Sequence, residues 1–187
     1  ERLNSPIGKQ DQYAAAFGGL NFFQFMPDGS VVAEKVKCSS STTNRIEKQI
    51  VVFYTGLMRS ANDVLSMQKK AMENSSKKFL LRRMVELSRV MKLEFENGNS
   101  DSFGQILHEN WCLKSQISKG ISNSQINQWY STAMQNGATG GKLLGAGSGG
   151  FLMFAAPPDK HDKIALELSP LKRCNFRFDP QGSRIIN

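Results

Sequence analysis

Residues 140–151 read Gly-Gly-Lys-Leu-Leu-Gly-Ala-Gly-Ser-Gly-Gly-Phe, the densest run of glycine in the chain. Glycine loses more backbone entropy on folding than any other residue, so such a run is kept where backbone must approach backbone or phosphate closely. Gly145, Gly147 and Gly150 satisfy G-x-G-x-x-G. The dinucleotide-binding fingerprint needs a strand before this pattern and a helix after it, whereas here a predicted helix precedes it and a predicted strand, residues 151–155, follows it. Two interpretations stay open, a tight turn entering a buried strand and a loop that cradles an anion.

Two other glycine-rich phosphate loops are excluded. A Walker A loop carries Ser or Thr directly after its lysine, but Lys142 is followed by Leu143. The glycine loop of protein kinases works with HRD and DFG motifs, and the chain has neither. The candidate glycine loop therefore consists of Gly145, Gly147, Ser148, Gly149 and Gly150.

A second cluster lies near the start of the chain, where residues 8–19 read Gly-Lys-Gln-Asp-Gln-Tyr-Ala-Ala-Ala-Phe-Gly-Gly. The alanines and the glycine pair predict a short helix that starts near Asp11 and ends at Gly18. A carboxylate at a helix N-terminus is stabilised by the helix dipole, so Asp11 is interpreted either as a cap or as a fixed, ionised acceptor for the proton of a hydroxyl group.

The strands are predicted from apolar and aromatic runs between turn signals. Residues 20–26 and 31–37 flank Pro-Asp-Gly and predict a β-hairpin. Residues 38–44 are polar and predict a loop, and residues 50–54 predict a buried strand. Two short strands are expected near the end of the chain, at 175–178 and 183–186.

Four helices are predicted between residues 60 and 137, and a fifth over residues 159–171. The first opens with a capping box at Ser60 and Asp63. The others show amphipathic stripes, which comprise Leu80, Met84, Leu87, Met91 and Phe95, then Phe103, Leu107 and Trp111, then Ile126, Trp129, Tyr130 and Ala133. Because strands are segregated from a run of helices, the fold class is predicted to be α+β.

Composition narrows the classes of partner. The 187 residues include 24 Lys plus Arg against 16 Asp plus Glu, a net charge of +8 that is spread along the chain. Without an RNP, zinc-finger or KH signature we expect no nucleic-acid partner, and an anionic small substrate suits the charge equally. No apolar run reaches the roughly 20 residues of a membrane helix, so no membrane partner is expected. Three widely spaced cysteines suit a cytoplasmic location.

The two clusters together resemble the second and third motifs of the GHMP small-molecule kinases, the relatives of galactokinase, homoserine kinase and mevalonate kinase. Within this family the sequence most resembles the sugar-kinase branch, and residues 52–56 together with Arg59 also resemble that branch. The resemblance implies a C-terminal GHMP-kinase domain over residues 51–187, with a ferredoxin-like core and added helices. Residues 1–50 are then the end of the N-terminal domain, with the second-motif helix and the hairpin.

The resemblance also implies roles for individual residues. Asp11 is expected to be the catalytic carboxylate that orients or deprotonates the acceptor hydroxyl as it attacks the γ-phosphate of ATP. Gln10, Gln12 and Tyr13 are expected to contact the sugar, and Arg59 to meet an anionic group on the substrate or to form a structural ion pair. The implied reaction phosphorylates a sugar phosphate, D-glycero-D-manno-heptose 7-phosphate, to the 1,7-bisphosphate.

The family's first motif, a Pro-x-x-x-Gly-Leu-Ser-Ser-Ser loop for the ATP phosphates, does not occur in the sequence. ATP and Mg²⁺ are therefore expected to bind mainly through a missing N-terminal half, with no metal ligand in this chain. Alone, the chain is expected to be inactive, and its uncovered strand edges are expected to cause homo-oligomerisation or poor solubility.

Two alternatives remain. A galactokinase- or fucokinase-like enzyme would phosphorylate a free sugar, and the two are distinguished by whether the acceptor carries a phosphate. A protein of a different class, a non-catalytic basic α+β module, would bind nucleic acid or a protein partner, and Asp11→Asn would leave its function unchanged.

Overall fold

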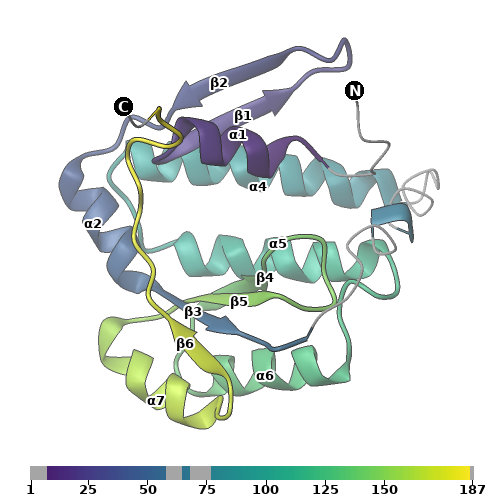
Figure 1. Cartoon of the computed structure of the whole chain (residues 1–187), viewed down its shortest axis with the longest axis vertical. Helices are drawn as coiled ribbons and strands as arrows, with labels where there is room; N and C mark the ends of the chain where they lie inside the picture. Colours follow the sequence, from purple (N-terminus) through teal and green to yellow (C-terminus); the bar gives the residue numbers. More distant parts are fainter. Residues whose placement is uncertain (1–7, 58–64, 68–76, 186–187) are drawn as a thin grey trace.

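A four-stranded antiparallel sheet organises most of the chain in the computed structural model, which describes residues 8–57, 65–67 and 77–185 (Figure 1). Its strands are ordered β4-β5-β3-β6. Numbered along the chain the order is 2-3-1-4, which is the ferredoxin-like βαββαβ arrangement and confirms the predicted α+β class. The bounds are Ile50–Tyr54 (β3), Gly140–Leu143 (β4), Phe151–Ala155 (β5) and Lys172–Cys174 (β6).

The two faces of this sheet bury different clusters of side chains, because residues alternate between faces along a strand. Val51 is paired with Phe154 and Phe53 with Leu152, and these side chains pack with α6 (Ser124–Gln135) and α7 (His161–Glu167). On the opposite face Ile50, Met153 and Ala155 pack with α4 (Lys78–Glu96) and α5 (Phe103–Ile117). The sheet is therefore covered by helices on both sides, as Figure 1 shows.

The amphipathic stripes of the predicted helices are confirmed. Leu80, Leu87 and Phe95 are buried along α4, and the helix ends before Gly98, whose φ of +77° is the left-handed conformation that stops a helix. α6 begins after Asn123, whose side chain accepts a hydrogen bond from the amide of Ile126 at 2.9 Å. The last predicted helix is shorter than expected, because α7 ends at Glu167 and follows the 3-10 turn Pro158–Lys160.

The predicted hairpin is confirmed as β1 (Asn21–Phe25) and β2 (Val31–Lys35), which form a separate two-stranded sheet. It lies with α1 (Gln10–Phe17) beyond α4, on the side away from the four-stranded sheet (Figure 1). Lys92 of α4 ties the hairpin down, since its ammonium pairs with Glu34 at 2.6 Å and lies over the ring of Phe22.

Three predictions about local structure are wrong. The Ser- and Thr-rich stretch after Cys38 is not a loop but α2 (Ser40–Gln49), because Ser39 caps it by accepting from the amide of Thr42 at 3.1 Å and Ile46 is buried. A strand, β4, and not a helix directly precedes the glycine loop. The final strand is at Lys172–Cys174 and not at 175–178, and residues 183–185 are not a strand.

The predicted capping box at Ser60 and Asp63 lies outside the described residues. A search of the described helices finds none that is long and apolar enough to cross a membrane.

Candidate active site

Gly140 determines how the site is assembled, because it allows α5 to lie directly against β4. A Cβ on Gly140 would lie 1.7 Å from the carbonyl oxygen of Gly104, and a Cβ on Gly104 would meet Thr139 equally closely. No residue larger than glycine fits this backbone contact. The contact brings Asn110 of α5 to the cavity that Lys142 of β4 also lines, and it places Lys114 within electrostatic range of Lys142.

Asp11 lies in the first turn of α1, one residue after the helix begins, and its side chain is exposed. The N-cap position is Lys9, which makes no capping hydrogen bond through its side chain, so Asp11 is not the cap itself. A carboxylate in the first turn of a helix interacts favourably with the helix dipole. Asp11 therefore supplies a negative charge at the end of α1 that faces the rest of the site.

The charge of Asp11 acts on two lysines that sequence reasoning did not select. Burial lowers the pKa of the Lys114 ammonium to about 8; the positive charge of Lys142 lowers it as well, and Asp11 acts in the opposite direction. Burial also lowers the pKa of Lys142, again partly offset by Asp11. The three side chains, from α1, α5 and β4, thus form one electrostatically linked group.

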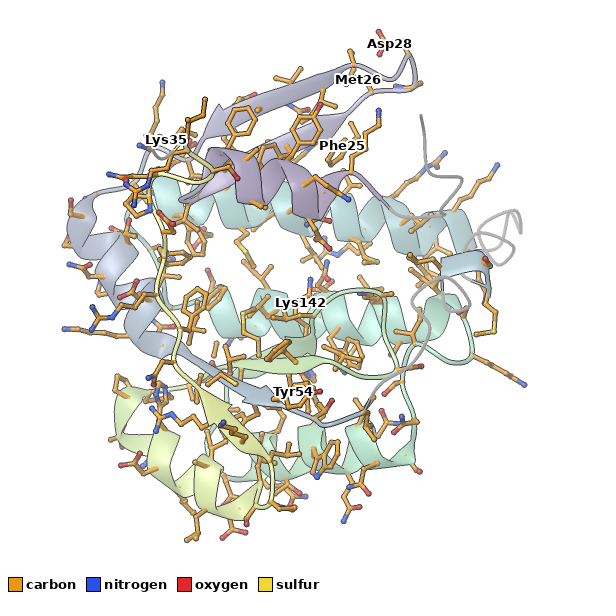
Figure 2. The ribbon with its side chains drawn as sticks, viewed as in Figure 1. Phe25, Met26, Asp28, Lys35, Tyr54 and Lys142 are labelled. Carbon is orange, nitrogen blue, oxygen red and sulfur yellow. The ribbon has the colours of Figure 1, made fainter. Side chains whose placement is uncertain are left out.

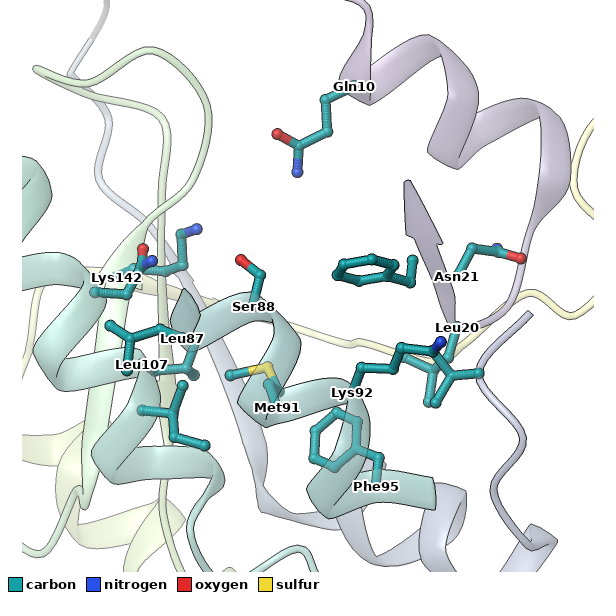
Figure 3. A pocket seen from close by; sticks show the side chains of 14 residues that line it. Gln10, Leu20, Asn21, Leu87, Ser88, Met91, Lys92, Phe95, Leu107 and Lys142 are labelled. Carbon is teal, nitrogen blue, oxygen red and sulfur yellow. The ribbon is translucent and has the colours of Figure 1, made fainter. Parts of the chain in front are cut away.

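Lys142 points into a cavity of about 270 Å³ between the hairpin and helices α4 and α5 (Figure 3). Gln10 reaches toward it from α1, and Ser88 and Asn110 add neutral polar groups. The remaining lining is mainly apolar and includes Leu20, Phe22, Leu87, Met91, Phe95 and Leu107. An apolar cavity with a few convergent polar groups is the usual form of a small-molecule site.

The glycine loop between β4 and β5 is held by backbone contacts. Ser148 is buried and has a φ of +64°. Its amide donates to the carbonyl of Ile121 at 2.9 Å, and its hydroxyl donates to the carbonyl of Gly120. A Cβ on Gly147 would lie 2.8 Å from the carbonyl oxygen of Ile121, and one on Gly149 would lie 2.3 Å from that of Leu57.

The two ends of the loop differ from its middle: Gly150 is hydrogen-bonded to Thr55, just after β3, and Gly145 has open space beside it. Gly150 accepts from the amide and the hydroxyl of Thr55, at 2.9 and 2.8 Å. Gly145, by contrast, has open space where a Cβ would be, and its carbonyl accepts from the ammonium of Lys114 at 2.7 Å. Most of the loop therefore packs as a tight turn, and its Gly145 end meets the lysine group.

A buried hydrogen-bond chain supports β4 beside Lys142. The hydroxyl of Tyr130 donates to the carbonyl of Gly141 at 3.3 Å, so the Nδ1 atom of His108 must donate to that hydroxyl at 2.8 Å. The Nε2 atom then faces the Sγ atom of Cys112 at 3.7 Å as an acceptor. Burial raises the pKa of Tyr130, which therefore stays a donor across the physiological pH range.

The other predicted site residues occupy varied positions. The side-chain amide of Gln12 lies beside the carbonyls of Gly8 and Lys9, and exchanging its oxygen and nitrogen lets the nitrogen donate to both, at 2.9 and 3.1 Å. Tyr13 packs with Phe17, Phe23 and Phe25 against the hairpin, with ring centroids 5.8 to 6.2 Å away. Arg59 lies outside the described residues. Their roles as substrate contacts stay predictions.

Within the described residues, no group of three or more His, Cys, Asp or Glu side chains could hold a metal ion. The charged side chains that line the cavity, Lys92 and Lys142, are both cations, and the charge of Asp11 acts on Lys142. This set suits an anionic ligand with a hydroxyl group more than it suits a cation.

Known proteins resemble the chain in both sequence and structure. Residues 91–170 match the family model described as GHMP kinases C terminal. The chain is 31% identical over 160 residues to the D-glycero-alpha-D-manno-heptose 7-phosphate kinase of Campylobacter jejuni. The matched region is 86% of this chain and 47% of that protein. The chain is 27% identical over 180 residues to the bifunctional fucokinase/GDP-fucose pyrophosphorylase of Arabidopsis thaliana, covering 92% of this chain and 16% of that protein.

The fold has solved counterparts. The crystal structure of a D-glycero-D-manno-heptose 1-phosphate kinase from Bacteroides thetaiotaomicron matches 96% of this chain with a TM-score of 0.66 and 24% identity, over 50% of that chain. This likeness supports the fold alone. The chain spans half or less of the length of each of these relatives. With the ferredoxin-like sheet and the glycine loop between β4 and β5, the matches identify a chain that carries the C-terminal domain of the GHMP kinase family.

Proposed function

We propose that the complete protein transfers a phosphoryl group from ATP to a hydroxyl group of a sugar phosphate, converting D-glycero-D-manno-heptose 7-phosphate to the 1,7-bisphosphate. The observation that carries the proposal is that the charge of Asp11 acts on both Lys114 and Lys142, and that Lys142 lines a cavity together with Gln10 of α1. Phosphoryl transfer needs positioning and charge neutralisation more than covalent chemistry, and these side chains supply both. The heptose phosphate kinase relative supports the choice of acceptor.

In this mechanism Asp11 accepts a hydrogen bond from the acceptor hydroxyl and takes its proton as the oxygen attacks phosphorus. The two ammonium groups offer positive charge to phosphate oxygens of a bound reactant, and so help to hold it in place. When bound, Mg-ATP supplies the phosphoryl group and ADP leaves. The proposal assigns ATP and Mg²⁺ mainly to residues outside this sequence.

The same proposal divides the chain near residue 50. Residues 1–50 would belong to the end of an N-terminal domain and residues 51–187 to the C-terminal domain. The separate sheets support this division, because the hairpin pairs only with itself while β3, the first strand of the second unit, lies inside the four-stranded sheet. On this assignment α1 and Lys142 face each other across a domain junction, a common place for a ligand.

The experiment measures ADP release by the complete protein, offered D-glycero-D-manno-heptose 7-phosphate, galactose and fucose in parallel. Turnover with the heptose phosphate alone supports the proposal. Turnover with none, in folded protein, overturns it. The 187-residue chain alone is expected to show no turnover, and micromolar binding of Mg-ATP to it would contradict the assignment of the nucleotide to other residues.

A free-sugar kinase is the second candidate, and the match to the fucokinase/GDP-fucose pyrophosphorylase favours it. It predicts turnover with fucose or galactose and no requirement for a phosphate on the acceptor. The apolar lining of the cavity suits the carbon skeleton of either acceptor.

A further inference from the structure

Lys142 is half-buried, and the described part of the chain does not pair its charge. Its ammonium makes no hydrogen bond or ion pair with any described residue, although it feels the charge of Asp11. The other lysine that lines the same cavity, Lys92, is paired with Glu34 at 2.6 Å. Enclosing an unpaired ammonium is costly unless a counter-charge completes the site. Lys142 therefore points to an anionic ligand.

A second cation defines the shape of the site. Lys114 is close enough to Lys142 for the two charges to repel each other, and its ammonium is anchored to the carbonyl of Gly145 at 2.7 Å. A dianion between the two ammonium groups would convert this repulsion into attraction on both sides. The amides of Gln10 and Asn110, which line the same cavity, are neutral donors for the remaining oxygens.

We propose that Lys142 and Lys114 form the subsite for the phosphate that the acceptor already carries, so that they select phosphorylated sugars over free ones. The inference rests on the proposed function and assigns this selectivity to two residues. A phosphomonoester is the ligand class because it brings two negative charges and several acceptor oxygens to two cations and two amides.

The position of Asp11 favours the acceptor phosphate over a phosphate of the nucleotide. Asp11 repels a dianion held directly beside it, so the carboxylate and the lysines suit opposite ends of one molecule, a hydroxyl at Asp11 and a phosphate at the lysines.

The first test titrates the 187-residue chain with inorganic phosphate, followed by ³¹P NMR or calorimetry. Lys142→Met keeps the apolar stem and removes the charge, and it is expected to weaken phosphate binding at least tenfold. Lys119→Met removes an exposed lysine and serves as the matched control, with unchanged binding expected. Lys142→Arg keeps the charge and is expected to retain most of the affinity. Equal phosphate affinity in the wild type and Lys142→Met overturns the proposal, as does an absence of phosphate binding in the wild type.

The second test separates the acceptor from the nucleotide in the complete protein. Lys142→Met is expected to raise KM for the sugar phosphate at least tenfold while KM for ATP stays within twofold. A rise confined to the KM for ATP overturns the proposal and assigns the lysines to the nucleotide. If the complete protein is not a kinase but phosphate binding still depends on Lys142, the proposed function fails and the subsite stands. A thermal unfolding curve of Lys142→Met that matches or exceeds the wild type shows that lost binding is not lost folding.

Discussion

Gly18 and Gly182 are in direct backbone contact, although 164 positions separate them in the chain. A Cβ on Gly18 would lie 2.2 Å from the amide nitrogen of Gly182, and a Cβ on Gly182 would lie 2.5 Å from the carbonyl oxygen of Ala16. Around this contact Gly19 donates to Asp179 at 2.6 Å, and Ser183 donates to Ala15 at 3.0 Å. The end of the described chain is thereby bound to α1, the helix that carries Asp11. The ribbon in Figure 2 shows the C-terminal segment reaching this helix.

This contact matters because little else holds α1. No residue of the helix is fully buried, and its main side-chain anchor is the packing of Tyr13 and Phe17 against the hairpin. Gly182→Val should therefore loosen α1, since its φ of +62° and the nearby backbone leave no room for a side chain. Hydrogen–deuterium exchange of the α1 amides is expected to become at least tenfold faster, and kcat of the complete protein to fall by a similar factor.

Ser183→Ala is the matched control for Gly182→Val. It removes one exposed hydrogen bond, from the Ser183 hydroxyl to the carbonyl of Ala15 at 3.2 Å, and leaves the backbone contacts in place. Exchange of the α1 amides should change less than twofold. Protection of α1 that is unaltered in Gly182→Val would show that the C-terminal segment does not position the helix.

Asp11→Asn tests the carboxylate assigned to the acceptor hydroxyl. The side chain is exposed, so the melting temperature should be nearly unchanged, while turnover of the complete protein should fall by about 10²–10⁴-fold, the range for the loss of a general base. Loss of its negative charge should also lower the pKa of Lys114 below about 8, measured by NMR of lysine side chains. A variant with wild-type turnover would remove Asp11 from the mechanism.

The pKa of Lys114 makes a prediction for stability as a function of pH. Because the pKa is about 8 in the folded protein and near its ordinary value of 10.5 in the unfolded chain, the unfolded state binds more protons between these limits. This lysine therefore adds nothing to the pH dependence below about pH 8 and makes the free energy of unfolding rise with pH above it.

Urea unfolding at pH 7 and pH 10 measures this effect. In the wild type, Lys114 makes the free energy of unfolding rise between pH 7 and pH 10. This rise should be smaller in Lys114→Met, measured at the same two pH values. Lys119→Met, at an exposed position on the following loop, should show the wild-type gain. An identical pH profile in Lys114→Met and wild type would show that Lys114 titrates normally.

Gly147→Val tests the packing of the glycine loop. Its φ of +125° strains any other residue, and its Cβ would lie 2.8 Å from the carbonyl oxygen of Ile121, so we expect a loss of about 1–3 kcal/mol in the free energy of unfolding together with reduced turnover. Gly145→Ala is the control, since its Cβ would meet open space and only the backbone strain at φ of +77° applies. Chemical denaturation of both variants should rank Gly147→Val as clearly more destabilising.

Local patterns predicted much of the fold. The stripe from Leu80 to Phe95 and the apolar run of β3 were interpreted correctly, because burial of one helix face or one strand leaves a periodic signature in the sequence. The same rules failed at α2, where the Ser- and Thr-rich composition favours a loop and the cap at Ser39 decided for a helix. They also failed at β4, because glycine has low strand propensity and is present there for a close approach.

The sequence by itself determined the α+β class, the hairpin, the amphipathic helices and the two motifs that resemble the GHMP kinases. Only the tertiary structure decided that Lys142 shares a cavity with Gln10, and that Lys114 and Lys142 interact with each other and with the charge of Asp11. The physical reason is that periodicity reports which side of an element is buried, whereas the meeting of α1, α5 and β4 depends on backbone contacts between distant glycines. Glycine has no side chain, so such contacts leave no periodic pattern in the sequence. Which glycines meet can therefore be seen only in the folded structure.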